Sequence, residues 1–125
     1  MKWTAWVTLA SLLMYLWMGL NVGRARAKFK IKAPACDGPV GFQSVLRVQL
    51  NTLEQFIVFL PALWMCAFFL SDRWAAIGGV AWVVGRIIYA LGYYKDPAKR
   101  GFGFMLSLIA SVGLMVGAAV GLLTF

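Results

Sequence analysis

The chain has 125 residues, of which 62% are hydrophobic, and twelve Lys and Arg against four Asp and Glu give it a formal charge of +8. This length fits one domain, and the composition is that of a membrane protein rather than of a soluble globular core. Most basic residues stand between apolar runs, which favours anchoring at a membrane surface over nucleic-acid binding. The chain has no histidine, and Cys36 and Cys66 form no CxxC pair, so we expect no metal site.

Four apolar runs follow one another along the chain, and each can cross a bilayer as a helix. They cover about residues 3–20, 45–70, 74–94 and 102–125. The second begins with a polar turn, the third contains Arg86, and the fourth has no charge. The expected fold class is therefore all-α and integral to the membrane, with residues 1–125 forming a single bundle of four transmembrane helices.

The first run could also belong to a cleaved signal peptide. Lys2 precedes it, and Ala-Arg-Ala at residues 25–27 resembles a cleavage site. However, the run is followed by five basic residues, namely Arg24, Arg26, Lys28, Lys30 and Lys32. Such a bias holds the downstream side in the cytoplasm, which is the reverse of a secretory signal, so we expect a retained helix.

The basic residues predict the orientation of the four spans. The connections 21–44 and 95–101 fall on one side of the membrane and hold five and three basic residues, whereas the other side has only Lys2 and Arg73. The positive-inside rule therefore places both basic connections in the cytoplasm and both termini outside.

Small residues recur every four positions in the fourth span. One series is Gly113, Gly117 and Gly121, and the other is Gly103, Ser107 and Ser111. This spacing predicts close contact with another helix, and it leaves open whether that helix belongs to the same chain.

Two spans carry polar residues on one face. Arg47, Asn51 and Glu54 stand at i, i+4 and i+7 of the second span. The third span has a similar face, formed at i, i+3 and i+7 by Arg86, Tyr89 and Tyr93. Both faces are expected in the cytoplasmic half of the bilayer, so one site could collect them.

Charged residues inside a span are costly, and they usually face the protein interior or a water-filled cavity. One interpretation is that these residues pair with each other and hold the helices together. However, Glu54 alone cannot neutralise Arg47, Arg86 and the nearby Arg100, and Arg26 flanks the same level. The excess of positive charge favours an anionic ligand, and a small zwitterion with carboxylates and an amine would satisfy both signs.

These residues carry a family resemblance. The segment RVQLNTLEQF, residues 47–56, resembles the Arg-x-Gln-x-Asn-x-x-Glu segment of the MAPEG family, the membrane-associated proteins of eicosanoid and glutathione metabolism. The segment GRIIYALGYYKDPAKR, residues 85–100, is similar to the Arg-x-x-Tyr-x-x-x-Tyr segment of that family with its downstream arginine. The resemblance covers most of the chain, including the four spans, and the short loops favour a bacterial member.

The resemblance implies a homotrimer with glutathione, as co-substrate, bound between neighbouring subunits near the cytoplasmic side. Eight residues match glutathione-contacting positions of the family, namely Arg26, Arg47, Gln49, Asn51, Glu54, Arg86, Tyr89 and Tyr93. Arg100 matches the arginine that lies beside the glutathione sulfur in leukotriene-forming members. The chain departs from those members at Gln55, where they have a tyrosine, and this leaves the lipid substrate open.

The function that the resemblance implies is that of a membrane-bound glutathione transferase. Arg100 would stabilise the glutathione thiolate, which attacks a hydrophobic electrophile or reduces a lipid hydroperoxide. One alternative is a non-catalytic scaffold that binds glutathione or lipid. A small exporter of cationic compounds is disfavoured, because the first span has no acid and arginines surround Glu54. The expected location is the bacterial inner membrane, among its lipids, with the site facing the cytoplasm.

Overall fold

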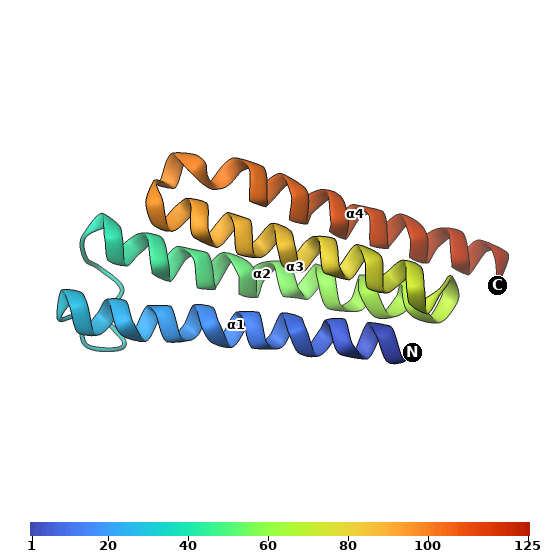
Figure 1. The fold of residues 1–125 in the computed structure, drawn as a ribbon, viewed down its shortest axis with the longest axis horizontal. Helices are drawn as coiled ribbons and strands as arrows, with labels where there is room; N and C mark the ends of the chain where they lie inside the picture. Colours follow the sequence, from blue (N-terminus) through green and yellow to red (C-terminus); the bar gives the residue numbers. More distant parts are fainter.

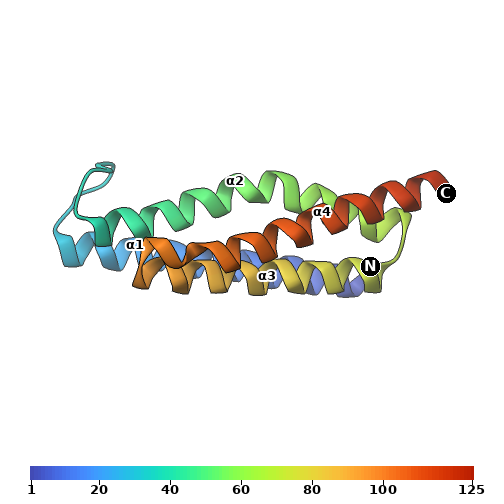
Figure 2. The ribbon, with the colours of Figure 1, turned by 90° about the horizontal axis from the view of Figure 1, so that it is seen from above.

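The computed structural model describes residues 1–125 as four long α-helices and one short 3-10 helix. In chain order these are α1 (Lys2–Phe29), α2 (Val40–Phe69), α3 (Asp72–Lys95), η1 (Pro97–Arg100) and α4 (Gly101–Thr124). The long helices lie side by side along one axis, with α2 behind α3 in the first view (Figures 1 and 2). Each is long and apolar enough to cross a membrane, which confirms the predicted fold class.

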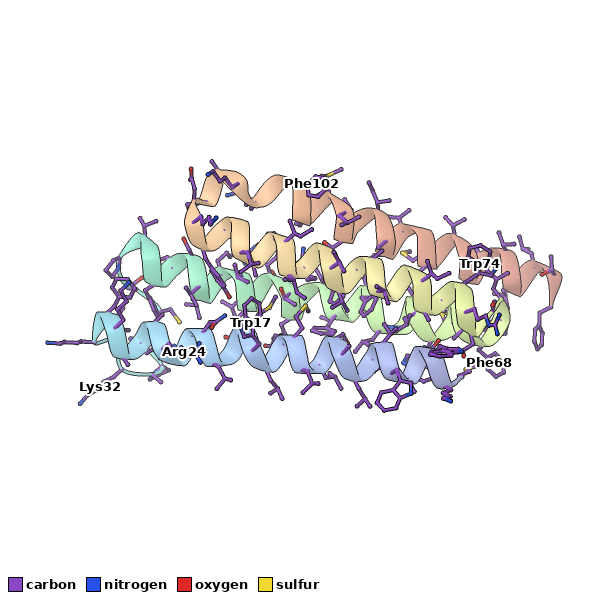
Figure 3. All side chains as sticks on the ribbon, in the orientation of Figure 1. Trp17, Arg24, Lys32, Phe68, Trp74 and Phe102 are labelled. Atoms are coloured by element: carbon purple, nitrogen blue, oxygen red, sulfur yellow. The ribbon has the colours of Figure 1, made fainter.

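The two ends of the bundle differ in what they carry. Figure 1 shows both termini and the turn between α2 and α3 at one end, and the 30–39 connection and η1 at the other. Lys32 and Arg24 mark the second end in Figure 3, and Trp74 marks the first. The basic connections that the sequence places on one side therefore meet at one end of the molecule.

The helix ends extend beyond the apolar runs. α1 continues to Phe29 and α2 begins at Val40, so the connection is 30–39 rather than 21–44. No glycine or proline interrupts residues 24–29, so backbone hydrogen bonding continues through this basic segment. The helix ends at Lys30, which adopts a left-handed conformation with φ 56° and ψ 48°. Hydropathy locates the bilayer crossing, whereas capping decides where the helix ends.

The interior of the bundle is built around aromatic residues of α2 and α3. The Trp82 ring lies parallel to the Phe59 ring at a centroid distance of 3.8 Å, and Phe56 packs against the same indole at 5.1 Å. The outward faces are apolar as well, and Ile57 and Leu123 are 75% and 88% exposed. An apolar surface of this extent needs lipid rather than water around it.

Glycines bring α3 and α4 into backbone contact. A Cβ atom on Gly85 would lie 2.7 Å from the Ser107 backbone nitrogen, and one on Gly103 would overlap the Tyr89 backbone nitrogen. Farther along, a Cβ atom on Gly121 would lie 2.5 Å from the Phe69 backbone. The small residues of α4 thus contact helices of the same chain, as their spacing allows, although Gly113 has no neighbour within 4 Å.

The turn between α2 and α3 is fixed to the start of α1. Ser71 caps α3 by accepting a hydrogen bond from the Trp74 backbone nitrogen. The Asp72 carboxylate accepts from the backbone nitrogens of Trp3 and Thr4, at 3.1 Å and 2.9 Å. Asp72 therefore satisfies free N–H groups at the start of α1 and complements the positive end of its dipole.

Candidate functional site

A polar hollow of about 430 Å³ lies between α2, α3 and the first turn of α4, toward the end that carries the basic connections. Its lining residues are Arg47, Asn51, Tyr89, Tyr93, Arg100 and Phe104. All but Phe104 are candidate site residues from the sequence. A larger hollow of about 570 Å³ at the opposite end is lined almost entirely by apolar side chains.

The helical repeat of α2 and α3 determines which side chains line this hollow. Arg47 and Asn51 stand one turn apart on α2, as do Tyr89 and Tyr93 on α3, whose rings meet edge to face at 5.6 Å. The short helix η1 then turns the chain back, so that the Arg100 guanidinium lies 5.7 Å from the centre of the Tyr93 ring. Arg47 and Asn51 thus line the hollow on the α2 side, and the rings of Tyr89 and Tyr93 line it on the α3 side.

The η1 turn has its own support. The Asp96 side chain accepts a hydrogen bond of 3.0 Å from the Ala98 backbone nitrogen and caps η1. Arg100 donates a long hydrogen bond of 3.4 Å to the Pro97 carbonyl oxygen and is otherwise exposed to solvent. Its guanidinium is held near the hollow without an acidic partner.

Arg86 lies behind the hollow rather than in its lining. Its side chain is fully buried, and its Nη1 donates to Asn51 Oδ1 at 2.8 Å and to Thr52 Oγ1 at 3.3 Å. On the opposite edge of the guanidinium, Nε and Nη2 donate to Ser107 Oγ at 3.1 Å and 3.0 Å. No carboxylate pairs with this guanidinium, which is solvated by neutral oxygens and by the Tyr89 ring at 4.3 Å.

This network fixes the Asn51 amide. Because Arg86 donates to Oδ1, the polar atom of Asn51 that remains free is the Nδ2 donor. Asn51 lines the hollow, so that donor is available to an anionic or carbonyl oxygen there. Arg86 therefore acts on the hollow through Asn51.

The only ion pair of the chain stands at the rim of the hollow. Arg47 Nη1 lies 3.3 Å from Glu54 Oε1, and both side chains are more than half exposed, at 51% and 60%. Glu54 thus offsets one positive charge, whereas Arg100 and the buried Arg86 have no acidic partner. The site retains an excess of positive charge beside one exposed carboxylate, an arrangement suited to a zwitterion with more than one carboxylate.

Besides Arg86 and Glu54, two candidate residues are absent from the lining of the hollow, and these two also form no hydrogen bond or salt bridge with the residues that line it. Arg26 donates to the Ala35 carbonyl oxygen at 2.8 Å and lies 5.3 Å from the centre of the Phe42 ring. The Gln49 side chain points toward α1, where its amide nitrogen would be 3.3 Å from a Cβ atom on Gly19. Within one subunit the structure does not bring these two residues to Arg47 and Asn51.

Three residues of the site were not identified from the sequence. Thr52 and Ser107 supply acceptor oxygens to Arg86, and Phe104 contributes an aromatic wall. Ser107 stands in the small-residue series of α4, whose spacing predicts only a packing face. The Ser107 hydroxyl could have been recognised as an acceptor, because a buried arginine without an acidic partner needs neutral oxygens to accept its hydrogen bonds. No group of three or more His, Cys, Asp or Glu side chains could hold a metal ion.

Comparison with known proteins identifies what the chain is similar to. The model of the MAPEG family matches residues 4–120. An uncharacterized protein of Synechocystis sp. is 47% identical over 121 residues, which are 97% of this chain and 88% of the relative. Microsomal glutathione S-transferase 2 of Mus musculus is 38% identical, over 92% of this chain and 78% of the relative. Leukotriene C4 synthase of Bos taurus is 34% identical, over 94% of this chain and 78% of the relative.

Proposed function

The chain belongs to the MAPEG family, a group of multi-pass membrane proteins, and on this premise we propose that it is a membrane-bound glutathione transferase. The relatives that carry an activity in their names are a glutathione S-transferase and leukotriene C4 synthase. The proposed reaction joins the sulfur of glutathione to a hydrophobic electrophile, and in a second reaction two glutathione molecules reduce a lipid hydroperoxide to its alcohol and water while they are oxidised to glutathione disulfide.

The observation that carries this proposal is the polar hollow with its excess of positive charge. Glutathione has two carboxylates, one amine and one thiol. Arg47 binds a carboxylate and Glu54 binds the amine, while the Nδ2 donor of Asn51, held by Arg86, binds a further oxygen. Tyr89 and Tyr93 cover the apolar parts of the peptide.

Arg100 is the residue to which we assign the chemistry. A thiol becomes a good nucleophile as thiolate, and an arginine stays protonated at any working pH. Lowering the pKa of the thiol by about two units needs roughly 2.7 kcal/mol of preferential stabilisation of the thiolate. A guanidinium close to the sulfur can supply that energy once bound glutathione excludes water from between the two groups. Arg100 lines the hollow and has no acidic partner, so its charge is available to the sulfur.

The second substrate would reach the sulfur from the membrane. The outward faces of the helices are apolar, so a hydrophobic electrophile dissolved in the surrounding lipid can approach the bundle directly.

We further propose a homotrimer in which Arg26 and Gln49 complete the site of a neighbouring subunit. Both residues lie away from the hollow of their own chain. The basic end would face the cytoplasm of a bacterium whose inner membrane holds the trimer, with both termini outside. The cyanobacterial relative and the concentration of basic residues at one end support this placement.

The proposal is tested by combining calorimetry with a turnover assay on the purified protein in lipid nanodiscs. Glutathione should bind, and product should form from glutathione and a chromogenic hydrophobic electrophile. The variant Arg47→Ala should weaken binding by about tenfold or more, because a charged hydrogen bond to a carboxylate is lost. The matched control Arg73→Ala removes a cation from the opposite end and should change nothing.

Each other function gives a distinct result. Binding without turnover for any electrophile or hydroperoxide would indicate a scaffold. Proton release on adding a lipophilic cation, without glutathione binding, would indicate an exporter. Either result would contradict the transferase.

A further inference from the structure

A second polar hollow lies at the basic end, on a different face of the bundle from the proposed glutathione site. Its volume is about 390 Å³, and it lies between the last turns of α1, the start of α2 and the end of α3. The residues that define its chemistry are Trp17, Asn21, Arg24, Lys28 and Tyr94, and none of them lines the first hollow. The two sites therefore do not share a ligand-binding side chain.

The floor of this second hollow is ordered by contacts between α1 and α3. Asn21 Nδ2 donates to the Tyr94 hydroxyl at 3.2 Å, and the Trp17 and Tyr94 rings meet edge to face at 6.1 Å. Figure 3 shows Trp17 in the middle part of α1 and Arg24 nearer its basic end. A Trp and Tyr floor is typical of the level where lipid acyl chains meet their headgroups.

The two cations of this hollow have no acidic partner within the chain, although Lys28 Nζ lies 5.3 Å from the centre of the Phe29 ring. Arg24 and Lys28 stand one turn apart on α1, and neither takes part in a salt bridge. Of the four acids, Glu54 pairs with Arg47, Asp72 caps α1, and Asp96 caps η1. The fourth, Asp37, lies in the 30–39 connection and forms no ion pair. The positive charge of this hollow is left for a ligand.

The depth of these cations matches a lipid phosphate. The first apolar run ends near Leu20, and at a rise of about 1.5 Å per residue Arg24 lies about 6 Å beyond it. The headgroup layer on each side of the hydrocarbon is also several ångströms thick. The hollow thus has an aromatic, partly apolar floor at the acyl boundary and two unpaired cations at the headgroup level.

We propose that this hollow binds the phosphate of an anionic glycerophospholipid from the surrounding leaflet, with the acyl chain beside Trp17. Two adjacent cations without an acid favour a net negative headgroup over a zwitterionic one, whose amine would be repelled. The site is independent of the proposed transferase activity, since no residue that we assign to glutathione belongs to it.

The test is native mass spectrometry of the purified protein exposed to equal amounts of phosphatidylglycerol and phosphatidylcholine with identical acyl chains. The wild-type protein should retain phosphatidylglycerol in preference. The double variant Arg24→Gln with Lys28→Gln should lose this preference by roughly thirtyfold, the factor expected for two juxtamembrane cations. The matched control, Lys30→Gln with Lys32→Gln, removes two charges at the same end that do not line the hollow and should retain the preference.

Three results would overturn the proposal. They are equal retention of both lipids by the wild type, equal loss of preference in the two double variants, and displacement of the lipid by soluble glycerol phosphate. The second result would mean that only the overall positive field matters, and the third that the site takes a soluble phosphate. The single variants Arg24→Gln and Lys28→Gln, which should each lose part of the preference, provide the test if the double variant does not fold. The melting temperature and glutathione affinity of each variant report folding separately.

Discussion

Arg86 is a fully buried guanidinium surrounded by neutral oxygens and aromatic rings. Removing a charge from water is costly, and the cost is offset here by four hydrogen bonds to Asn51, Thr52 and Ser107. The planar fork of arginine donates to both sides at once, to α2 from one edge and to α4 from the other. Arg86 therefore links three helices and sets the orientation of the Asn51 amide.

Arg86→Lys should weaken both the bundle and the site. A lysine ammonium keeps the charge but cannot span from Ser107 to Asn51, so buried acceptors lose their donors. We expect the free energy of unfolding to fall by about 2 kcal/mol or more, and the glutathione affinity to fall as well. Thermal unfolding and calorimetry in nanodiscs measure the two effects. The control is Arg73→Lys, at an exposed position without hydrogen bonds. If Arg86→Lys leaves the melting temperature and the glutathione affinity unchanged, as the control should, Arg86 does not have this role.

The sequence was sufficient to group most of the site residues. Arg47, Asn51 and Glu54 share a face because the helical period fixes their directions, and the same holds for Tyr89 and Tyr93. It could not show that the tip of Arg86 ends behind Asn51, because that depends on how α2, α3 and α4 cross. For the same reason Ser107 was interpreted as a packing residue rather than as an acceptor.

At the scale of the elements, the contact between α3 and α4 positions the site. Gly85 and Gly103 let the two backbones touch, and this brings Ser107 within reach of Arg86. A side chain at either glycine would separate the helices. The spacing of small residues in α4 predicted a close contact, but not which of them makes it, since spacing carries no information on crossing angle.

Gly103→Ala should destabilise the protein, whereas Gly113→Ala should not. A Cβ atom at Gly103 would overlap the backbone of Tyr89, which cannot move aside as a flexible side chain can. The expected loss in unfolding free energy is about 1–3 kcal/mol, with weaker glutathione binding as Ser107 leaves Arg86. Nothing lies within 4 Å of the corresponding atom at Gly113, so alanine there should be neutral or slightly stabilising.

Thermal unfolding of the two glycine variants side by side tests this prediction, because the chemical change is identical. Equal melting temperatures would show that α3 and α4 do not depend on backbone contact at Gly103. A selective loss in Gly103→Ala, accompanied by reduced glutathione affinity, would link the helix crossing to the site.

At the scale of the whole molecule, the basic residues are concentrated at one end of the bundle. The 30–39 connection, the last turns of α1 and the η1 region hold most of the basic residues, and the opposite end has Lys2 and Arg73. The sequence alone predicted four membrane-crossing helices because apolar length determines that property. It did not predict the ends of α1 and α2, because charged residues continue a helix beyond the bilayer when no breaker follows.

Cys36 offers a direct test of the proposed orientation. It is a free and exposed thiol in the 30–39 connection, whereas Cys66 is buried. In sealed right-side-out vesicles, a membrane-impermeant maleimide should label Cys36 only after permeabilisation, because the proposed orientation places the basic end in the cytoplasm. Cys36→Ser should abolish the signal. A cysteine introduced by Arg73→Cys in that background should be labelled without permeabilisation, and the reverse pattern would invert the orientation.

The central claim is that Arg100 converts bound glutathione into a thiolate, and ultraviolet absorbance tests it most directly. Titrating the purified protein with glutathione near neutral pH should produce a thiolate band that saturates. In Arg100→Ala that band should disappear while calorimetry shows nearly unchanged glutathione affinity. If Arg100→Ala instead retains the thiolate band, or loses glutathione binding altogether, Arg100 is not the activating residue and the proposed mechanism is wrong.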